Sequence, residues 1–183
     1  MDSEKILFNK DGFSFVCEQK NKYKLKFNME NKNIILSKIV DFSLIKLIYD
    51  LNPDVYEKVN IQKINENEAI VTLLMKHLYE DLGLPQRFSH IRMIKSVEER
   101  RIVFNSQSIT DHRPEGMPTD AELMAIKQLN CICHIFSDHN IGFSVNVNFE
   151  PNMNVPPFAE KLVGIILYKI FKRVKQFIEN VRM

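Results

Sequence analysis

The residues best suited to chemistry are cysteines and histidines that stand close together late in the chain. Cys131, Cys133 and His134 are near neighbours, and His139 follows a few positions later. Thiolate and imidazole groups are common zinc ligands, so the grouping raises the hypothesis of a metal site. On a β-strand, however, Cys131 and Cys133 point to one face and His134 points to the other. We therefore favour buried free cysteines on a core strand, and expect no metal and no other cofactor.

Two carboxylate–histidine pairs, Asp111-His112 and Asp138-His139, are the next candidates for catalysis. Adjacent residues rarely orient as base and supporting acid, and the sequence has no Gly-x-Ser-x-Gly nucleophile elbow. A cysteine nucleophile has the same weakness, because a thiol inside a strand is usually inert without a nearby cation. The sequence also lacks a glycine-rich phosphate loop. We therefore do not expect an enzyme.

The composition is that of an ordinary globular chain. Its 183 residues suit one domain, and the net charge of +2 predicts no general attraction to nucleic acid. The first residues lack the basic-then-apolar pattern of a signal peptide, and no window approaches the roughly 18 unbroken apolar residues of a membrane span. Three cysteines, an odd number, favour a reducing compartment over a disulfide framework. We expect a single domain over residues 1–183 and a cytoplasmic location.

The N-terminal part predicts strands followed by a short helix. Strands are expected at 6–8, 13–17, 23–27 and 34–40, and Asp11-Gly12 marks a turn between the first two. Lys22, Lys24 and Lys26 share one face of the third strand, which predicts a solvated face, with a phosphate-binding stripe as the alternative. Asp41 is typical of a helix N-cap, and Pro53 ends that helix.

The middle of the chain predicts more strands, and its end predicts one long helix. The strands are expected at 59–64, 69–78, 91–97, 101–109, 124–136 and 141–149, and the alternation in the fifth slips near Gln128, as at a β-bulge. The helix runs from Phe158 to about Val181, after Pro157, which suits a first helical turn. Its apolar stripe comprises Val163, Leu167, Ile170, Val174, Phe177 and Val181.

These elements predict an α+β fold of the helix-grip kind. A curved antiparallel sheet would carry a short helix after its N-terminal strands, and the long C-terminal helix would pack across the concave face. Nearly every residue between Leu162 and Phe171 is apolar, so the first half of this helix needs cover on more than one side. If the sheet is curved enough, sheet and helix enclose a cavity.

Several short motifs, taken in order, resemble the START lipid-transfer domain, a family of the helix-grip (Bet v 1-like, or SRPBCC) class. Leu47-Ile48-Tyr49-Asp50 and then Tyr56-Glu57 are similar to a leucine-rich helix and a following aromatic–acidic pair. Phe88 of Gln86-Arg87-Phe88 matches an Arg-Asp-Phe motif. The remaining similar stretches are Ser106-Gln107-Ser108-Ile109, His112-Arg113-Pro114, Phe149-Glu150-Pro151 and Val155-Pro156-Pro157. The resemblance covers about residues 34–181 and leaves 1–33 as N-terminal strands.

The resemblance implies a hydrophobic tunnel that holds one lipid, such as a phospholipid or a sterol, and transfers it between membranes. The last helix and the loop at 111–120 would act as gates. We place near the cavity Met75, Phe88, Met93, Phe104, Phe143, Leu162, Ile166 and Ile170, and we expect Arg92 or Arg101 to contact a polar head group. The alternative is that these apolar residues are only core and these arginines only surface.

Other functions remain open at this point. The apolar first half of the last helix could instead be a contact face of a protein-interaction module, and a small enzyme could use the same cavity. The basic residues of this helix are Lys161, Lys169, Lys172, Arg173, Lys175 and Arg182. They predict a solvated face, or alternatively docking on an anionic membrane. The sequence does not indicate the oligomeric state.

Overall fold

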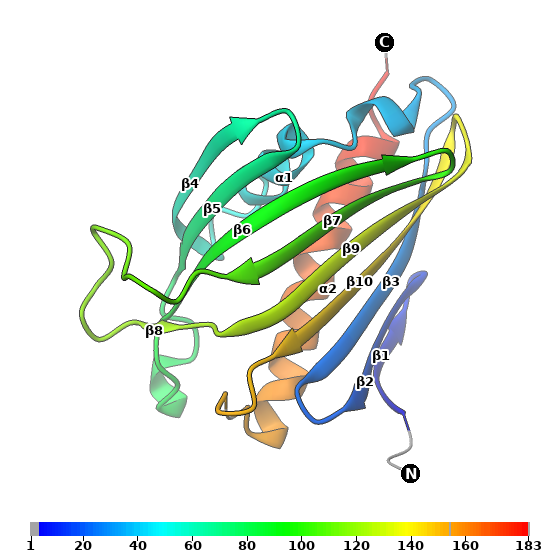
Figure 1. The fold of residues 1–183 in the computed structure, drawn as a ribbon. Coiled ribbons are helices and arrows are strands. Elements are labelled where there is room, and N and C mark those ends of the chain that lie inside the picture. Colours follow the sequence, from blue (N-terminus) through cyan, green and yellow to red (C-terminus); the bar gives the residue numbers. More distant parts are fainter. Residues whose placement is uncertain (1–3, 154, 183) are drawn as a thin grey trace.

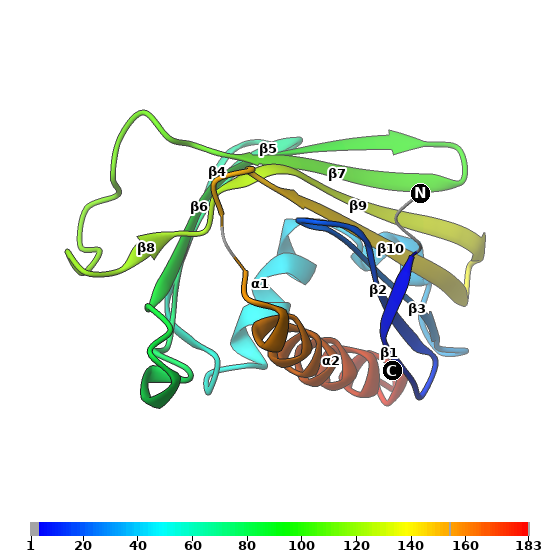
Figure 2. The same cartoon turned by 90° about the horizontal axis from the view of Figure 1, so that it is seen from below.

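A curved antiparallel sheet with helices on its concave side is the architecture of the computed structural model, which describes residues 4–153 and 155–182 (Figures 1 and 2). This confirms the predicted α+β fold. The strands are β1 (Lys5–Lys10), β2 (Phe13–Gln19), β3 (Lys22–Glu30), β4 (Tyr56–Asn65), β5 (Glu68–Met75), β6 (Arg87–Glu98), β7 (Arg101–Ser108), β8 (Glu122–Leu123), β9 (Ile126–Ser137) and β10 (Asn140–Phe149). The helices are α1 (Phe42–Asp50), α2 (Pro157–Glu179) and the short 3-10 turns η1 (Leu36–Ile39) and η2 (Glu80–Leu82).

The sheet pairs a strand from the first part of the chain with strands from its last part. Its strand order is β1-β2-β3-β10-β9-β7-β6-β5-β4, and β8 adds a short parallel pair to β6. β10 therefore lies between β3 from the beginning of the chain and β9, its own hairpin partner. The chain then leaves β10 and turns back as α2, which runs across the concave face (Figure 2).

Local signals in the sequence act as expected in several places. Asp11 and Gly12 both have positive φ in the β1–β2 turn, the conformation that Asp-Gly favours. The Asp41 carboxylate caps α1 by accepting a hydrogen bond from the Ser43 backbone N–H at 2.8 Å. The register between β9 and β10 shifts at Gln128, which confirms the predicted bulge.

The predicted strand at 34–40 is wrong. The segment forms η1 instead, and the backbone N–H of Leu36 bonds to the carbonyl of Asp138 in the β9–β10 turn at 2.7 Å. A short apolar run is equally compatible with a strand and with a buried helical turn, so periodicity alone could not separate them. The predicted strand at 69–78 also ends earlier, at Met75.

A close approach to β2 fixes the first half of α2. Gly164 faces the fully buried ring of Phe15, and a Cβ atom at Gly164 would lie only 3.0 Å from Phe15 Cδ1. Phe15 has little room to retreat, because its ring also stacks on Tyr23 with centroids 5.8 Å apart. The missing side chain therefore sets how near the helix comes to the sheet.

We expect Gly164→Val to lower the free energy of unfolding by about 1–3 kcal/mol, because the added side chain overpacks Phe15. Gln176→Val is the matched control, since Gln176 is an exposed position of the same helix. Chemical denaturation of both variants checks this. Equal stabilities would contradict the close packing at Gly164.

Candidate functional site

The concave face of the sheet is almost entirely apolar. Alternate residues of each strand point to it, and the helices cover it. Its buried members include Phe13, Phe15, Leu25, Phe27, Met29, Val71, Leu73, Ile91, Met93, Ile102, Phe104, Cys133, Ile141 and Phe143. This face and the sides of α1 and α2 that meet it are called the interior below.

The two halves of α2 meet the interior differently. In the second half Ile170, Val174 and Ile178 are buried against the core. Val163 lies two turns before Ile170 on nearly the same side of the helix, yet 37% of it is exposed, against 2% for Ile170. Ile166, on the same side, is also only partly buried. In the first half the buried residues are the small Ala159 and Gly164, whereas the larger Val163 and Ile166 keep accessible surface, so the large side chains of this half are packed more loosely than those of the second.

The sheet is less completely buried at the same end. Along β10, Ile141 and Phe143 are buried, whereas Val145, Val147 and Phe149 on the same face are only partly buried. The chain direction places the end of β10 beside the start of α2, and Figure 1 shows both at the lower end of the molecule. Two opposed apolar surfaces thus both retain accessible area at one place.

A pair of tyrosines connects α1 with the edge of the sheet. Tyr49 lies in the last turn of α1 and Tyr56 begins β4, and their rings meet edge to face with centroids 4.9 Å apart. Tyr56 pairs across the sheet with Met75, and all three side chains pack on the main core. Burial raises the pKa of both phenols, so they stay protonated at neutral pH.

The cysteines behave as core residues. Cys131 and Cys133 of β9 share the interior face, and burial raises the pKa of each thiol to about 12. Such thiols are poor nucleophiles. In the part of the chain that the structure describes, no group of three or more His, Cys, Asp or Glu side chains could hold a metal ion.

A charged clamp fixes α2 to the end of α1. The Arg173 guanidinium donates to both carboxylate oxygens of Asp54, and Lys169 pairs with the same carboxylate. Arg173 also donates to the Asn52 side-chain oxygen at 3.0 Å, and the Asn52 amide donates to the Ile48 carbonyl at 2.7 Å. Asn52 is fully buried, so the clamp joins α1, the following turn and α2 in one network.

The first turn of α2 has its own polar anchor. Tyr23 of β3 donates to Glu160 at 2.8 Å, and Lys5 of β1 lies 3.5 Å from the same carboxylate. The Tyr23 ring contacts Phe149, with centroids 6.1 Å apart in an edge-to-face arrangement. Glu160 thus places a negative charge close to the loosely packed end of the interior.

The structure brings together most of the residues predicted to surround a cavity. Met93, Phe104 and Phe143 are buried in the interior face, and Met75 packs at its edge. Ile170 is buried in the second half of α2. The last two, Leu162 and Ile166, lie partly buried on the loosely packed first half of the helix.

Three of the predicted residues lie outside the interior. Phe88 is on the opposite face of β6, where it packs with Leu74 and Ala121. Arg92 bonds to Glu68 on the outer face at 2.6 Å, and Arg101 bonds to Glu98 in the β6–β7 hairpin at 2.5 Å. The outward positions of Phe88 and Arg92 follow from the alternation along β6. In this strand Ser89, Ile91 and Met93 point inward, so the residues between them point outward.

The predicted gate loop at 111–120 also lies elsewhere. Met117 of this loop packs on the Phe88 cluster, and Arg113 lies over the Phe88 ring, 4.8 Å from its centroid. The loop therefore covers the outer face of β6 and not the interior. The predicted stripe of α2 needs a similar correction at Phe177, which is 48% exposed, because the buried side of the helix continues through Ile178.

Four residues that pack against the core are not among those predicted for the site: Tyr49, Tyr56, Val145 and Val147. The alternation of β10 did predict that Val145 and Val147 face inward together with Phe143. The contact between the two tyrosines could have been predicted from their positions on either side of the turn at residues 52–54. A tight turn brings the end of a helix close to the start of the next strand.

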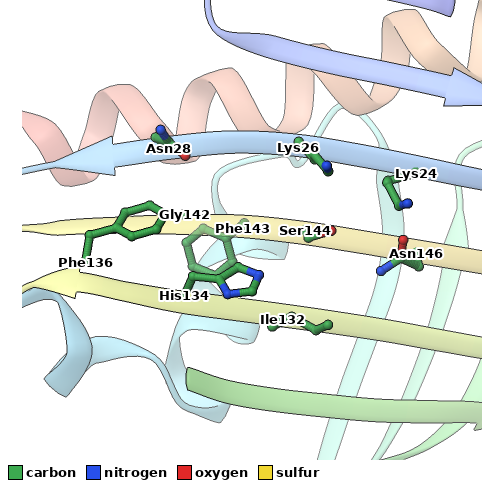
Figure 3. A pocket seen from close by; sticks show the side chains of 10 residues that line it. All are labelled: Lys24, Lys26, Asn28, Ile132, His134, Phe136, Gly142, Phe143, Ser144 and Asn146. Atoms are coloured by element: carbon green, nitrogen blue, oxygen red, sulfur yellow. The ribbon is translucent and has the colours of Figure 1, made fainter. Parts of the chain in front are cut away.

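Two hollows lie outside the interior. Figure 3 shows one of about 450 Å³ on the outer face of β3, β10 and β9, with Lys24 and Lys26 on one side and His134 and Phe136 on the other. Lys24 is paired with Glu18, as expected of a solvated strand face. The second, about 470 Å³, is an apolar groove between η1, α1 and the end of α2. Among the described residues, no helix is long and apolar enough to cross a membrane.

Comparison with known proteins gives a clear fold and no sequence relative. No protein-family model and no curated protein matches the sequence. Human STARD10 superposes with a TM-score of 0.69 at 10% identity, over 96% of this chain and 73% of that chain. The lipid transfer and protein localization domain of human StarD13 gives 0.71 at 7% identity, over 99% and 91%. Human StAR-related lipid transfer protein 5 gives 0.66 at 13% identity, over 98% and 89%.

These matches confirm the START-like, helix-grip fold that the motifs indicated. They extend over nearly the whole chain, including the N-terminal strands that the motif resemblance had left out. Identities this low establish the shared fold alone.

The clamp predicts a pH-dependent stability. Arg173, and then Lys169, hold the pKa of the Asp54 carboxyl well below its usual range. We expect Asp54→Asn to cost about 1 kcal/mol or less at neutral pH, since the pair is partly exposed. A depressed pKa stabilises the fold above the unfolded value of about 4, and this contribution is lost as pH falls toward the folded value. Urea unfolding of both proteins at neutral and acidic pH checks this. A difference that grows on acidification would contradict it.

Proposed function

We propose that this START-like fold binds an apolar ligand, most simply a lipid, in its interior and carries it between membranes. The observation that supports this is the incomplete burial of two apolar surfaces, one on α2 and one on β10, at the same end of the molecule. Val163 and Ile166 of α2 and Val145 and Val147 of β10 retain accessible area there, although the same faces are closely packed one or two turns further along. A ligand chain in this space would complete the core.

The free energy for binding would come from removing apolar ligand surface from water, at about 25 cal/mol per Å². In this proposal Met75, Leu162 and Ile166 contact the ligand directly. Met93, Phe104, Phe143 and Ile170 form the closely packed wall behind it. Two flexible methionines in this set suit ligands of variable shape. Phe88, Arg92 and Arg101 take no part.

The first half of α2 is the element best placed to move for ligand uptake. The second half is held by the Asp54 clamp and by buried Ile170, Val174 and Ile178, whereas the first half is held mainly by Glu160 and by contact at Gly164. Figure 2 shows α2 lying along the open side of the sheet. Separation of this half from the sheet would expose the interior while the clamp keeps the helix attached.

A membrane contact fits the same half of the helix better than the basic half. Phe158 and Ile165 are more than half exposed, and Lys161 lies between them. By contrast, Lys169, Lys172, Arg173 and Lys175 already pair with acidic residues of the fold. We propose that Phe158 and Ile165 enter the lipid surface when the ligand is exchanged.

The exposed apolar side of α2 also supports a second candidate, a protein-interaction module. Phe158, Ile165 and Phe177 are each about half exposed on one long helix. A partner helix or a second copy of the chain could cover them. This function needs no ligand in the interior, which separates it from the first.

Native mass spectrometry of the purified protein, followed by organic extraction, tests the proposal most directly. We expect a lipid bound in near-stoichiometric amount, because the unpacked interior is costly when empty. Light scattering on the same sample gives the oligomeric state. An empty protein that forms dimers would overturn lipid binding in favour of the interaction module.

A tryptophan at position 166 should block the interior. We expect Ile166→Trp to reduce lipid binding by about tenfold or more, because the indole fills space that the ligand would occupy. Gln176→Trp is the matched control, since Gln176 is an exposed position in the second half of the same helix. Binding of a fluorescent fatty acyl probe measures both. Equal binding by both variants would remove Ile166 from the site.

A further inference from the structure

We propose that the hollow on the outer face of β3, β10 and β9 binds a nucleotide, with the base against Phe136 and His134 and the phosphate at Lys26 (Figure 3). This site is separate from the interior and does not depend on lipid binding, because Lys24 and Lys26 alternate along β3 with Leu25, which is buried in the interior face. Three features of the hollow support the assignment: its shape, its two parallel rings and its charges.

The hollow exists because β10 has a glycine at an outward position. Gly142 lies between Asn28 of β3 and His134 of β9 in the register of the sheet. A Cβ atom on Gly142 would lie 2.7 Å from Phe136 Cε2 and 2.9 Å from Asn28 Oδ1, so a side chain there would displace the Phe136 ring. The ring instead bounds one end of a hollow of about 450 Å³ (Figure 3). This volume lies within the range of about 300–1,000 Å³ that is usual for small-molecule sites.

Two rings form one wall of the hollow. Phe136 and His134 are two positions apart on β9, so both point to the outer face. Their ring planes differ by only 10°, with centroids 6.4 Å apart. Phe136 is also 55% exposed, so much of its ring is available for contact. Aromatic side chains on an open sheet face provide a surface on which a nucleobase can stack.

The opposite wall is cationic. Lys24 and Lys26 of β3 line it, and no Asp or Glu is among the described residues that line the hollow. Lys24 is paired with Glu18, which partly neutralises its charge. Lys26 has no acidic partner among the described residues, and its neighbours across the sheet are the uncharged Ser14 and Ser144. A phosphate in the hollow would therefore pair first with Lys26, in a charge-assisted hydrogen bond.

Uncharged polar groups lie between the two walls. Asn28 of β3 and Ser144 and Asn146 of β10 also line the hollow, and none of these three side chains has a hydrogen-bond partner among the described residues. Amides and hydroxyls both donate and accept, as the hydroxyls of a sugar and the edge of a base require. An inorganic anion would leave the rings unused, and a hydrocarbon chain would leave Lys26 unpaired. A nucleotide uses all three parts of the hollow.

Titration of the full chain with four small molecules tests whether both walls take part. Calorimetry compares AMP with adenosine, ribose 5-phosphate and inorganic phosphate. We expect AMP to bind at least about tenfold more tightly than each of the other three, because only AMP carries both a base and a phosphate. Backbone amide chemical shifts should change with AMP at the hollow, on β3, β9 and β10.

Two variants then separate the roles of the two walls. We expect Lys26→Gln to weaken AMP binding by about tenfold, the effect of a lost hydrogen bond to a charged group, and to leave adenosine binding unchanged. Phe136→Ala should weaken both AMP and adenosine by about fivefold or more, because each loses a stacking contact. Both replaced side chains are exposed, so both variants should melt at the temperature of the parent protein.

Matched controls lie on the same strands or beside them. Lys22→Gln removes a lysine of β3 that does not line the hollow, and Val97→Ala removes apolar surface from a side chain of β6 that is 65% exposed. Both should leave AMP affinity unchanged.

Several results would overturn the proposal. These are absence of AMP binding at millimolar concentration, equal affinity for all four small molecules, and AMP affinity that neither Lys26→Gln nor Phe136→Ala changes. A single-stranded oligonucleotide that binds where AMP does not would also overturn it and assign this face to nucleic acid. Lipid binding has its own test in native mass spectrometry, so failure of the nucleotide site and failure of the proposed function are seen separately.

Discussion

The junction between α1 and the second half of α2 determines how the rest of the interior is arranged. Asn52 is fully buried there, and its side chain bonds to the Ile48 carbonyl and to Arg173, which also grips Asp54. Asn52 is buried and the Arg173–Asp54 pair is partly exposed, so the network adds directional hydrogen bonds to the apolar packing of Ile170, Val174 and Ile178 in this half of the helix. The distance between the first half of α2 and the sheet is set separately, by the contact between Gly164 and Phe15.

The result is an interior with two different regions. Around Ile141, Phe143 and Ile170 it is a closely packed core, which gives the fold its stability. Around Val145, Val147 and Val163 the apolar side chains keep part of their surface accessible. The two regions share one face of the sheet, so the closely packed region supports the partly accessible region beside it.

The fold was largely predictable from the sequence, and the site was only partly so. Strict alternation in β3 and β10, the Asp41 cap and the Asp11-Gly12 turn are local signals, and each acts as local physics requires. The prediction of a strand at 34–40 was wrong because the conformation of this segment depends on a contact with Asp138, about a hundred residues further along the chain. Phe88 and Arg92 were assigned to the wrong face of β6 for a related reason. Which face of β6 points inward depends on its register with β5, and a shift of one residue would exchange the two sets.

The position of β10 in the sheet has a consequence for how the chain reaches its native state. β3 is made early in synthesis, but its partner β10 comes more than a hundred residues later, and α2 follows last of all. The interior faces of β2 and β3, with Phe13, Phe15, Leu25 and Phe27, must therefore wait for cover until almost the whole chain has been made. Contacts so distant in sequence close large loops before they gain any stability, which makes folding slow. During that interval the N-terminal strands present an apolar face and a free edge, so the nascent chain is most exposed to aggregation just before β10 arrives.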